Sequence, residues 1–213
     1  MTVVQSLFPS AVACVFSDRP PSNFDLLAAE TDATRNMRAT RLREFVHGRA
    51  CARQALADLG FPECAVPVGE DRAPVWPDGI VGSISHSDNH ATAVVVRSTD
   101  HQGLGVDLEV NEPLEASLLP MLCRPEELAR LGQPATNPAL PKIVFSAKES
   151  VFKCIWPMVR RFVDFQEIEI RIDIGAGSFV AIPHTENLPH ALIKKIRGRY
   201  VQSDKLIITG AYV

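Results

Sequence analysis

The stretch Leu104-Gly105-Val106-Asp107-Leu108-Glu109-Val110 alternates between apolar and acidic residues from Val106 onward. This period of two predicts a half-buried strand, because successive side chains of a strand point to opposite faces. Asp107 and Glu109 then share one face, roughly 6.5–7 Å apart along the strand, and both can reach one divalent cation or its water shell. An edge strand with a solvated acidic face is the alternative, and the D-x-E pattern alone favours it.

The composition is that of an ordinary globular protein, with 46% hydrophobic and 22% charged residues among 213. This length suits one large domain or two small, closely packed ones. No run approaches the ~20 apolar residues of a membrane span, and a net charge of −3 gives no reason to expect nucleic-acid binding. The cysteines are scattered, and no two form a C-x-x-C pair. They therefore favour reduced thiols in a cytoplasmic protein over disulfides or a structural zinc site.

A helix is predicted over 35–59, where apolar residues follow helical spacing until Gly60. Arg49 and Arg53 lie four residues apart beside its apolar stripe. Their guanidinium groups must reach water or bind an anion. Snorkelling into water and phosphate binding are equally good interpretations of this pair.

Ser85 and His86 end the first of two strand-like pieces, which follow a proline-rich loop that presents Arg72 and Trp76. Ser85 does not lie in a G-x-S-x-G elbow, so a hydrolase triad is not indicated. His86 lacks the further histidine and cysteine ligands of a zinc site. It is either a hydrogen-bonded structural residue or an anion contact.

A second helix is predicted over 145–156, where Pro157 ends it. Ser146-x-x-Glu149 matches a capping box, so in one interpretation Glu149 only satisfies a backbone N–H. Lys148 and Glu149 nevertheless fall in line with apolar positions, and burying such charges is costly unless they meet partners. A functional pair is the other interpretation.

In this order, the motifs closely resemble those of the 4′-phosphopantetheinyl transferases of the enterobactin synthetase component D type. The resemblance covers roughly residues 41–165. Its specific part is the pair Val106-Asp107-Leu108-Glu109 and Phe145-Ser146-Ala147-Lys148-Glu149, about forty residues apart. It implies an α+β fold of two similar halves with pseudo-twofold symmetry, residues 1–114 and 115–213, with the site between them in one monomeric chain.

The resemblance also implies a reaction, in which phosphopantetheine moves from coenzyme A to a serine of an acyl or peptidyl carrier protein and 3′,5′-ADP leaves. By the same resemblance, Asp107, Glu109 and Glu149 would hold Mg²⁺, which also binds the pyrophosphate. Glu149 would in addition be the base, acting directly or through a metal-bound water molecule.

The family's coenzyme A contacts extend to the cationic residues. The resemblance implies that His86 and Lys148 contact the pyrophosphate, with Ser85 beside them and Lys153 as a helper. Arg49, Arg53 and Arg72 would hold the nucleotide and its 3′-phosphate. Position 72 is arginine where relatives often have lysine, which changes the contact geometry because arginine grips phosphate with a fork.

The carrier protein is expected to present an acidic helix, so a partly apolar and partly basic surface should receive it. One stretch after the acidic strand has this character, although it equally fits the core face of a short helix: Leu118, Leu119, Met121, Leu122 and Arg124.

Two other functions fit the same residues. A catalytically silent module would bind coenzyme A or a nucleotide without producing a holo carrier. A Mg²⁺-dependent nucleotide hydrolase would use the same carboxylates and release phosphate from coenzyme A without any carrier.

Overall fold

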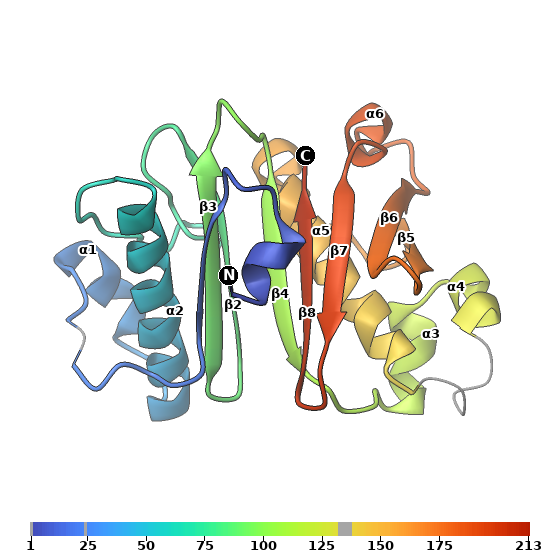
Figure 1. Ribbon diagram of the computed structural model, residues 1–213, viewed down its shortest axis with the longest axis horizontal. Helices are drawn as coiled ribbons and strands as arrows, with labels where there is room; N and C mark the ends of the chain where they lie inside the picture. Colours follow the sequence, from blue (N-terminus) through green and yellow to red (C-terminus); the bar gives the residue numbers. More distant parts are fainter. Residues whose placement is uncertain (1, 24, 132–137) are drawn as a thin grey trace.

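Two antiparallel sheets lie next to each other in the protein, and a helix of 20 residues covers one face of each (Figure 1). The computed structural model describes residues 2–23, 25–131 and 138–213. This architecture confirms the predicted α+β class, and the repetition of one long helix on one sheet is what two similar halves require. Within the described ranges, no helix is long and apolar enough to cross a membrane.

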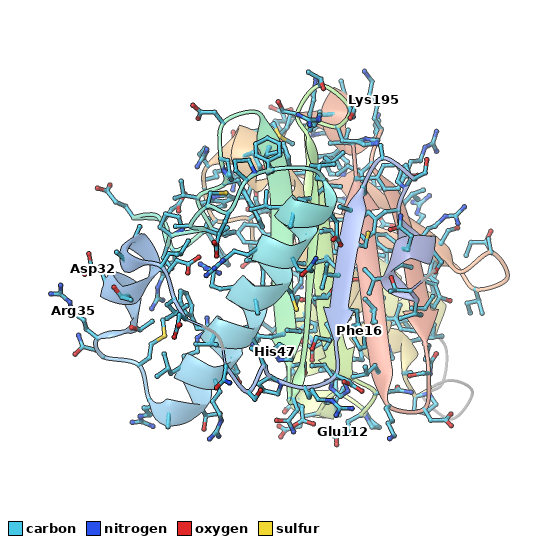
Figure 2. All side chains as sticks on the ribbon, turned by 60° about the vertical axis from the view of Figure 1, so that its left-hand side comes forward. Phe16, Asp32, Arg35, His47, Glu112 and Lys195 are labelled. Carbon is cyan, nitrogen blue, oxygen red and sulfur yellow. The ribbon has the colours of Figure 1, made fainter. Side chains whose placement is uncertain are left out.

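The first sheet has the strand order β1-β3-β2, with the bounds Ala13–Ser17, His90–Arg97 and Ile80–Ser87. Helix α2, Ala39–Asp58, packs small side chains such as Ala52 and Ala55 against this sheet. Figure 2 shows α2 lying across the strands. The predicted helix is confirmed with a later start, and Gly60 follows it in the left-handed conformation, with φ of 81°.

The second sheet has the order β4-β8-β7-β6-β5, and helix α5, Leu140–Val159, packs mainly on β4 and β8. The strands are β4 Leu104–Val110, β5 Ile168–Asp173, β6 Ser178–Pro183, β7 Arg197–Gln202 and β8 Leu206–Tyr212. The short helices are η1 Val4–Leu7, α1 Ala28–Thr31, η2 Asp32–Thr34, η3 Ala116–Leu118, α3 Leu119–Leu122, α4 Pro125–Leu131 and α6 His190–Ile193.

Strand β4 is confirmed where the alternation predicted it, and it is buried on both faces. Val106 and Leu108 join a core cluster with residues of η1. Gly105 and Asp107 face α5, and a β-carbon at Gly105 would lie only 1.7 Å from the Ser150 carbonyl oxygen. Glycine therefore allows the helix to approach this closely. The prediction of a half-buried strand is wrong because α5 covers the acidic face, which leaves Asp107 4% exposed.

Two serine hydroxyls join the sheets where β2 meets β4. Ser83 Oγ accepts a hydrogen bond from Val106 N at 3.1 Å, and Ser85 Oγ accepts one from Leu108 N at 3.2 Å. Strand β4 is the edge strand of the five-stranded sheet, and these hydroxyls from β2 satisfy donors that a free edge would leave unpaired. The alternative is therefore right about the edge position and wrong about the solvated acidic face, because α5 covers that face. Strand β4 belongs to the predicted half 1–114 but pairs with β8 near the end of the chain. The division between 114 and 115 stays a prediction.

Helix α5 begins at Leu140, with Pro141 in its first turn, where a missing N–H is tolerated. Ser146 and Glu149 consequently lie inside the helix, and the capping-box interpretation of this pair is wrong. The helix also continues past Pro157, so the predicted end is wrong. Glu149 lies in the interior of α5 and therefore caps no backbone N–H group at its start. Its role has to be inferred from the charged groups around it.

Candidate active site

Asp107 lies at the centre of the site, buried between β2, β4 and α5. Its Oδ1 accepts hydrogen bonds from Lys153 Nζ at 2.7 Å and from Ser85 Oγ at 3.0 Å, and its Oδ2 accepts one from Ser146 Oγ at 2.8 Å. Lys153 Nζ also donates to Ser85 Oγ at 3.2 Å and to the Val106 carbonyl oxygen at 3.1 Å. The ammonium group of Lys153 therefore neutralises a carboxylate that burial would otherwise penalise heavily.

Glu109 and Glu149 lie near enough to Asp107 for their charges to interact. Burial and the charge of Asp107 raise the pKa of Glu109, against the opposing effect of Lys142, whose Nζ lies 3.5 Å from Glu109 Oε2. Burial also raises the pKa of Glu149; Lys153 opposes this shift, while Asp107 and Glu109 add to it. Strand β4 and helix α5 thus bring the three predicted carboxylates into one region.

These carboxylates suit a hard divalent cation in kind, because Mg²⁺ prefers oxygen ligands. Among the residues that the structure describes, however, no three histidine, cysteine, aspartate or glutamate side chains are placed to hold a metal ion together. Lys153 and Lys142 lie beside Asp107 and Glu109 instead. A bound cation would take over from these ammonium groups as the neutralising charge. The three carboxylates fit such an ion by their chemistry, and their side chains would have to move closer together to hold it.

His86, at the end of β2, contacts the first turns of α2. Arg41 Nη1 contacts His86 Nε2, and His86 Nδ1 lies 3.6 Å from Glu44 Oε2. Burial lowers the pKa of His86, Arg41 lowers it further, and Glu44 opposes them. The charges of Lys153 and Asp107 also reach the imidazole. His86 therefore lies between the cations of α2 and the acidic centre.

Lys148 is buried and has partners of its own. Its Nζ lies 2.7 Å from Glu127 Oε2 and donates to the Phe165 carbonyl oxygen at 2.6 Å. Glu127 also accepts hydrogen bonds from the backbone N–H groups of Arg124 and Ile170, each at 2.6 Å. Lys148 thus holds α5 against α4 and β5. A pyrophosphate contact by Lys148 would require this buried pair to break.

Arg49 and Arg53 lie on α2 as predicted, and their guanidinium groups are mostly buried. Arg49 is 6% exposed, its Cζ lies 4.3 Å from the centre of the Phe45 ring, and burial lowers its pKa to about 10. Arg53 contacts Glu63 and lies 3.8 Å from the buried Glu30. Snorkelling into water is therefore the wrong interpretation, and Arg53 already has carboxylate partners.

A groove of about 960 Å³ opens between the loop 69–76, strand β2 and the C-terminal end of α5. Its aromatic lining consists of Trp76, Phe152, Trp156 and Phe162, and its cationic lining of Arg72, Lys153 and Arg160. Because Lys153 also contacts Asp107, the groove leads to the acidic centre. The structure thus connects the predicted residue Arg72 to the central carboxylate through this groove.

Arg41, Ser146 and Lys142 contact the predicted site residues, and their signals in the sequence were weak. Arg41 precedes Arg49 by two steps of four along α2, on the same helix face, and this spacing was the available signal. Ser146 matches a capping box in one of the two interpretations given above, and Lys142 follows a proline-rich stretch without any signal. The contacts of Ser146 and Lys142 depend on which strand faces α5, and the contact of Arg41 with His86 depends on how α2 packs on β2; no local pattern reveals either.

Of the residues predicted to receive the carrier, some are exposed, as a docking surface requires, and others are buried, as the core face of a short helix requires. Leu118 and Met121 are 37% and 58% exposed, Leu119 is half-buried and Leu122 is buried in the core. Arg124 Nε lies 3.3 Å from a carboxylate oxygen of Glu126. The exposed pair forms an apolar surface next to α4, and Leu122 belongs to the core.

Two family models match the chain in succession: the 4′-phosphopantetheinyl transferase N-terminal domain over residues 29–96, and the 4′-phosphopantetheinyl transferase superfamily over residues 103–203. The 4′-phosphopantetheinyl transferase Svp of Streptomyces mobaraensis is 39% identical over 221 residues, which cover 99% of this chain and 89% of that protein. The 4′-phosphopantetheinyl transferase Npt of Nocardia iowensis is 30% identical over 218 residues, 98% of each chain. Enterobactin synthase component D of Escherichia coli (strain K12) is 38% identical over 172 residues, 79% of this chain and 76% of that protein. The resemblance inferred from the motifs is confirmed, and the chain belongs to the 4′-phosphopantetheinyl transferase superfamily.

Proposed function

We propose that the protein transfers the 4′-phosphopantetheine group of coenzyme A to a serine hydroxyl of an acyl or peptidyl carrier protein and releases 3′,5′-ADP. The observation that carries this proposal is the position of Lys153, whose ammonium group contacts Asp107 and also lines the groove. A pyrophosphate bound there would meet a cation and the acidic centre together. Membership of the superfamily supports phosphopantetheine as the transferred group.

Asp107, Glu109 and Glu149 would hold Mg²⁺ in this reaction. When bound, the ion supplies positive charge that stabilises the negative charge of the transferring phosphoryl group. Lys153 contacts Asp107 Oδ1, and a cation held by the same carboxylate would weaken this contact through charge repulsion. Because Lys153 also lines the groove, its ammonium group would then be free to contact a phosphate oxygen there.

Glu149 is the proposed base for the attacking serine. It is half-buried on α5, and no described residue gives its carboxylate a hydrogen bond, which leaves both oxygen atoms able to accept a proton. The serine oxygen attacks the β-phosphorus of coenzyme A, its proton passes to Glu149 directly or through a water molecule, and 3′,5′-ADP leaves. Glu149 therefore has two proposed roles, as a ligand and as a base.

Coenzyme A is proposed to lie in the groove, where aromatic side chains offer faces for the adenine ring. Arg72 would bind the 3′-phosphate with charge-assisted hydrogen bonds, and Ser85 and His86 would lie nearer the pyrophosphate. Arg49 and Arg53 would have to exchange their present contacts to reach the nucleotide, so their assignment stays a prediction. The same holds for the pyrophosphate contact of Lys148.

The carrier protein is proposed to dock on the apolar surface formed by Leu118 and Met121, which project from η3 and α3. These short helices follow β4 in the chain, and Leu122 of α3 packs in one core cluster with residues of α5, the helix that carries Glu149 and Lys153. Arg124, at the start of α4, would supply a positive charge for an acidic carrier helix.

Incubation with coenzyme A, Mg²⁺ and an apo carrier protein tests the proposed function by mass spectrometry. The expected result is a carrier heavier by one phosphopantetheine group, with formation of 3′,5′-ADP; a chelator should abolish both and Mg²⁺ should restore them. Binding of coenzyme A without modification of any carrier in a panel would indicate a silent binding module. Phosphate release without a carrier would indicate a nucleotide hydrolase, and either result would overturn the proposal.

A further inference from the structure

The loop 69–76 forms a tight hairpin along the groove. Gly69 N donates to the Ala73 carbonyl oxygen at 2.8 Å, and Arg72 N donates to the Gly69 carbonyl oxygen at 2.9 Å. Arg72 lies at the tip with φ of 67°, a left-handed conformation that a residue other than glycine keeps only when its surroundings impose it. The position of its side chain therefore depends on the contacts that hold the tip.

Asp71 provides these contacts, and it links the loop to α5. Its Oδ1 accepts a hydrogen bond from Ala73 N at 3.0 Å, inside the hairpin. Its Oδ2 accepts hydrogen bonds from Trp156 Nε1 at 3.1 Å and from Arg160 Nη1 at 3.3 Å, at the C-terminal end of α5. We call the two contacts to Trp156 and Arg160 the Asp71 bridge. It connects segments from the two predicted halves of the chain.

All three partners of Asp71 are hydrogen-bond donors, so they require a side chain with two acceptor oxygens. An ionised carboxylate accepts at both oxygens, whereas the amide of asparagine has one acceptor and one donor. In either orientation, the amide nitrogen of an asparagine at this position would face an N–H group, either of Ala73 or of Trp156 and Arg160. The hairpin turn and the Asp71 bridge together therefore require an acid.

We propose that Asp71 is a positioning residue for coenzyme A, which sets the width of the groove and directs Arg72 toward the nucleotide by holding the loop against α5. The ligand in this inference rests on the proposed function, while the Asp71 bridge exists in the protein without any ligand. Asp71 contacts no reacting group in the proposed mechanism. Its own negative charge repels phosphates, so its contribution has to come from the placement of the loop.

Loss of the Asp71 charge and loss of the Asp71 bridge should change the affinity for coenzyme A in opposite directions. The direction of the measured change therefore tests the inference. Coenzyme A is a polyanion, so electrostatics alone would make it bind more tightly when a negative charge leaves the groove. Asp71→Asn should instead weaken binding, because the loop loses the Asp71 bridge. Glu70→Gln is the matched control: Glu70 is exposed, lines the same groove and has no side-chain hydrogen bond among the described residues.

Both tryptophans of the chain, Trp76 and Trp156, line the groove, so intrinsic fluorescence reports on it. Coenzyme A is titrated into the wild type and both variants without a carrier, and kcat and KM are then measured with one. Asp71→Asn should weaken coenzyme A binding and raise its KM about fivefold or more, the scale of one or two lost hydrogen bonds. The kcat and the KM for the carrier should stay unchanged. Glu70→Gln should bind coenzyme A at least as tightly as the wild type, and equal behaviour of the two variants would overturn the inference.

Two further measurements connect the effect to Arg72 and separate it from the proposed function. If Asp71 acts through Arg72, Asp71→Asn should weaken coenzyme A binding much less in an Arg72→Ala background than in the wild type. An equal loss of affinity in both backgrounds would refute this connection. Without any ligand, Asp71→Asn should speed hydrogen exchange at the Ala73 amide and shift the emission of Trp156. If both stay unchanged, the inference fails by itself. A wild type that binds coenzyme A but modifies no carrier would refute only the transfer reaction.

Discussion

Asp107→Asn removes the charge of the central carboxylate while keeping its shape. The wild-type side chain accepts hydrogen bonds from Lys153, Ser85 and Ser146 and is almost fully buried. The amide oxygen can take over the bonds from Lys153 and Ser85, and the amide nitrogen can donate to Ser146 Oγ, since a hydroxyl also accepts. The substitution therefore tests mainly the negative charge beside the Lys153 ammonium group.

The expected loss of stability is about 2 kcal/mol. A hydrogen bond to a charged group contributes roughly 1.5–3 kcal/mol and a neutral one roughly 0.5–1.5 kcal/mol, so losing the charge costs about 1 kcal/mol. In the variant the Lys153 ammonium group has no counter-charge. Because its side chain is 27% exposed, this adds about 1 kcal/mol and not the roughly 3–5 kcal/mol of a fully buried ion pair that loses one partner. At roughly 2–4 °C per kcal/mol for a chain of this length, Tm should fall by about 4–8 °C.

Two assays separate the structural role of Asp107 from its proposed metal role. Thermal unfolding without divalent ions measures the loss of Tm. Added Mg²⁺ should raise the Tm of the wild type, because an ion that binds only the native state stabilises it, and should leave the variant unchanged. Transfer activity, measured well below the Tm of the variant, should fall by about 10²-fold or more, because metal ligation contributes several kcal/mol to the transition state.

The structural role and the metal-binding role of Asp107 have separate contradicting outcomes. An unchanged Tm without Mg²⁺ would mean that the Lys153–Asp107 pair adds nothing to the stability of the fold. A variant that keeps the Mg²⁺-dependent rise in Tm, or transfers at the wild-type rate at limiting Mg²⁺, would show that Asp107 is not a metal ligand.

Three more variants test other parts of the site and the fold. Glu149→Gln should lower kcat by about 10²-fold or more, the scale of a general base, without changing Tm, and full activity would return Glu149 to a structural role. Arg72→Ala should reduce the preference for coenzyme A over 3′-dephospho-coenzyme A in kcat/KM by about 10-fold or more, the scale of a charge-assisted hydrogen bond; an unchanged preference would place the 3′-phosphate elsewhere. Burial alone would raise the pKa of Glu169, but Arg171, His184 and Arg130 lower it to about 2. Its stabilisation is thus present above the unfolded pKa of about 4.3 and is lost as the pH falls through about 2. In denaturant titrations, Glu169→Gln should therefore cost about 2 kcal/mol at neutral pH and progressively less toward pH 2, and a deficit independent of pH would contradict this assignment.

The periodic patterns of apolar and polar residues were sufficient to predict two elements of the fold. The alternation around Val106 predicted β4 and the common face of Asp107 and Glu109, and the spacing of apolar residues predicted α2. Such signals depend only on the geometry of one element, with a period of 2 for a strand and 3.6 for a helix. The two acidic motifs and their separation were specific enough to indicate the family.

Signals for the ends of elements were less dependable. Ser146-x-x-Glu149 resembles a helix start, but α5 begins at Leu140, because apolar residues from Ile143 onward pack into the core and extend the helix toward its N-terminus. Pro157 was expected to end α5, yet the last turn continues past it. Packing across an element can therefore override a local capping or stop signal.

Local sequence patterns were sufficient to predict that Asp107 and Glu109 share a face and that one helix carries Arg49 and Arg53. What the charged groups contact depends on the packed fold, which places Lys153 beside Asp107, Glu127 beside Lys148, and α5 in place of water over the acidic face of β4. This difference arises because the period of an element is set by neighbours in the chain, whereas the partner of a charged side chain comes from segments far away in sequence. Whether a buried charge is neutralised, and by which cation, follows from the packing of β4 against α5, which no local pattern encodes.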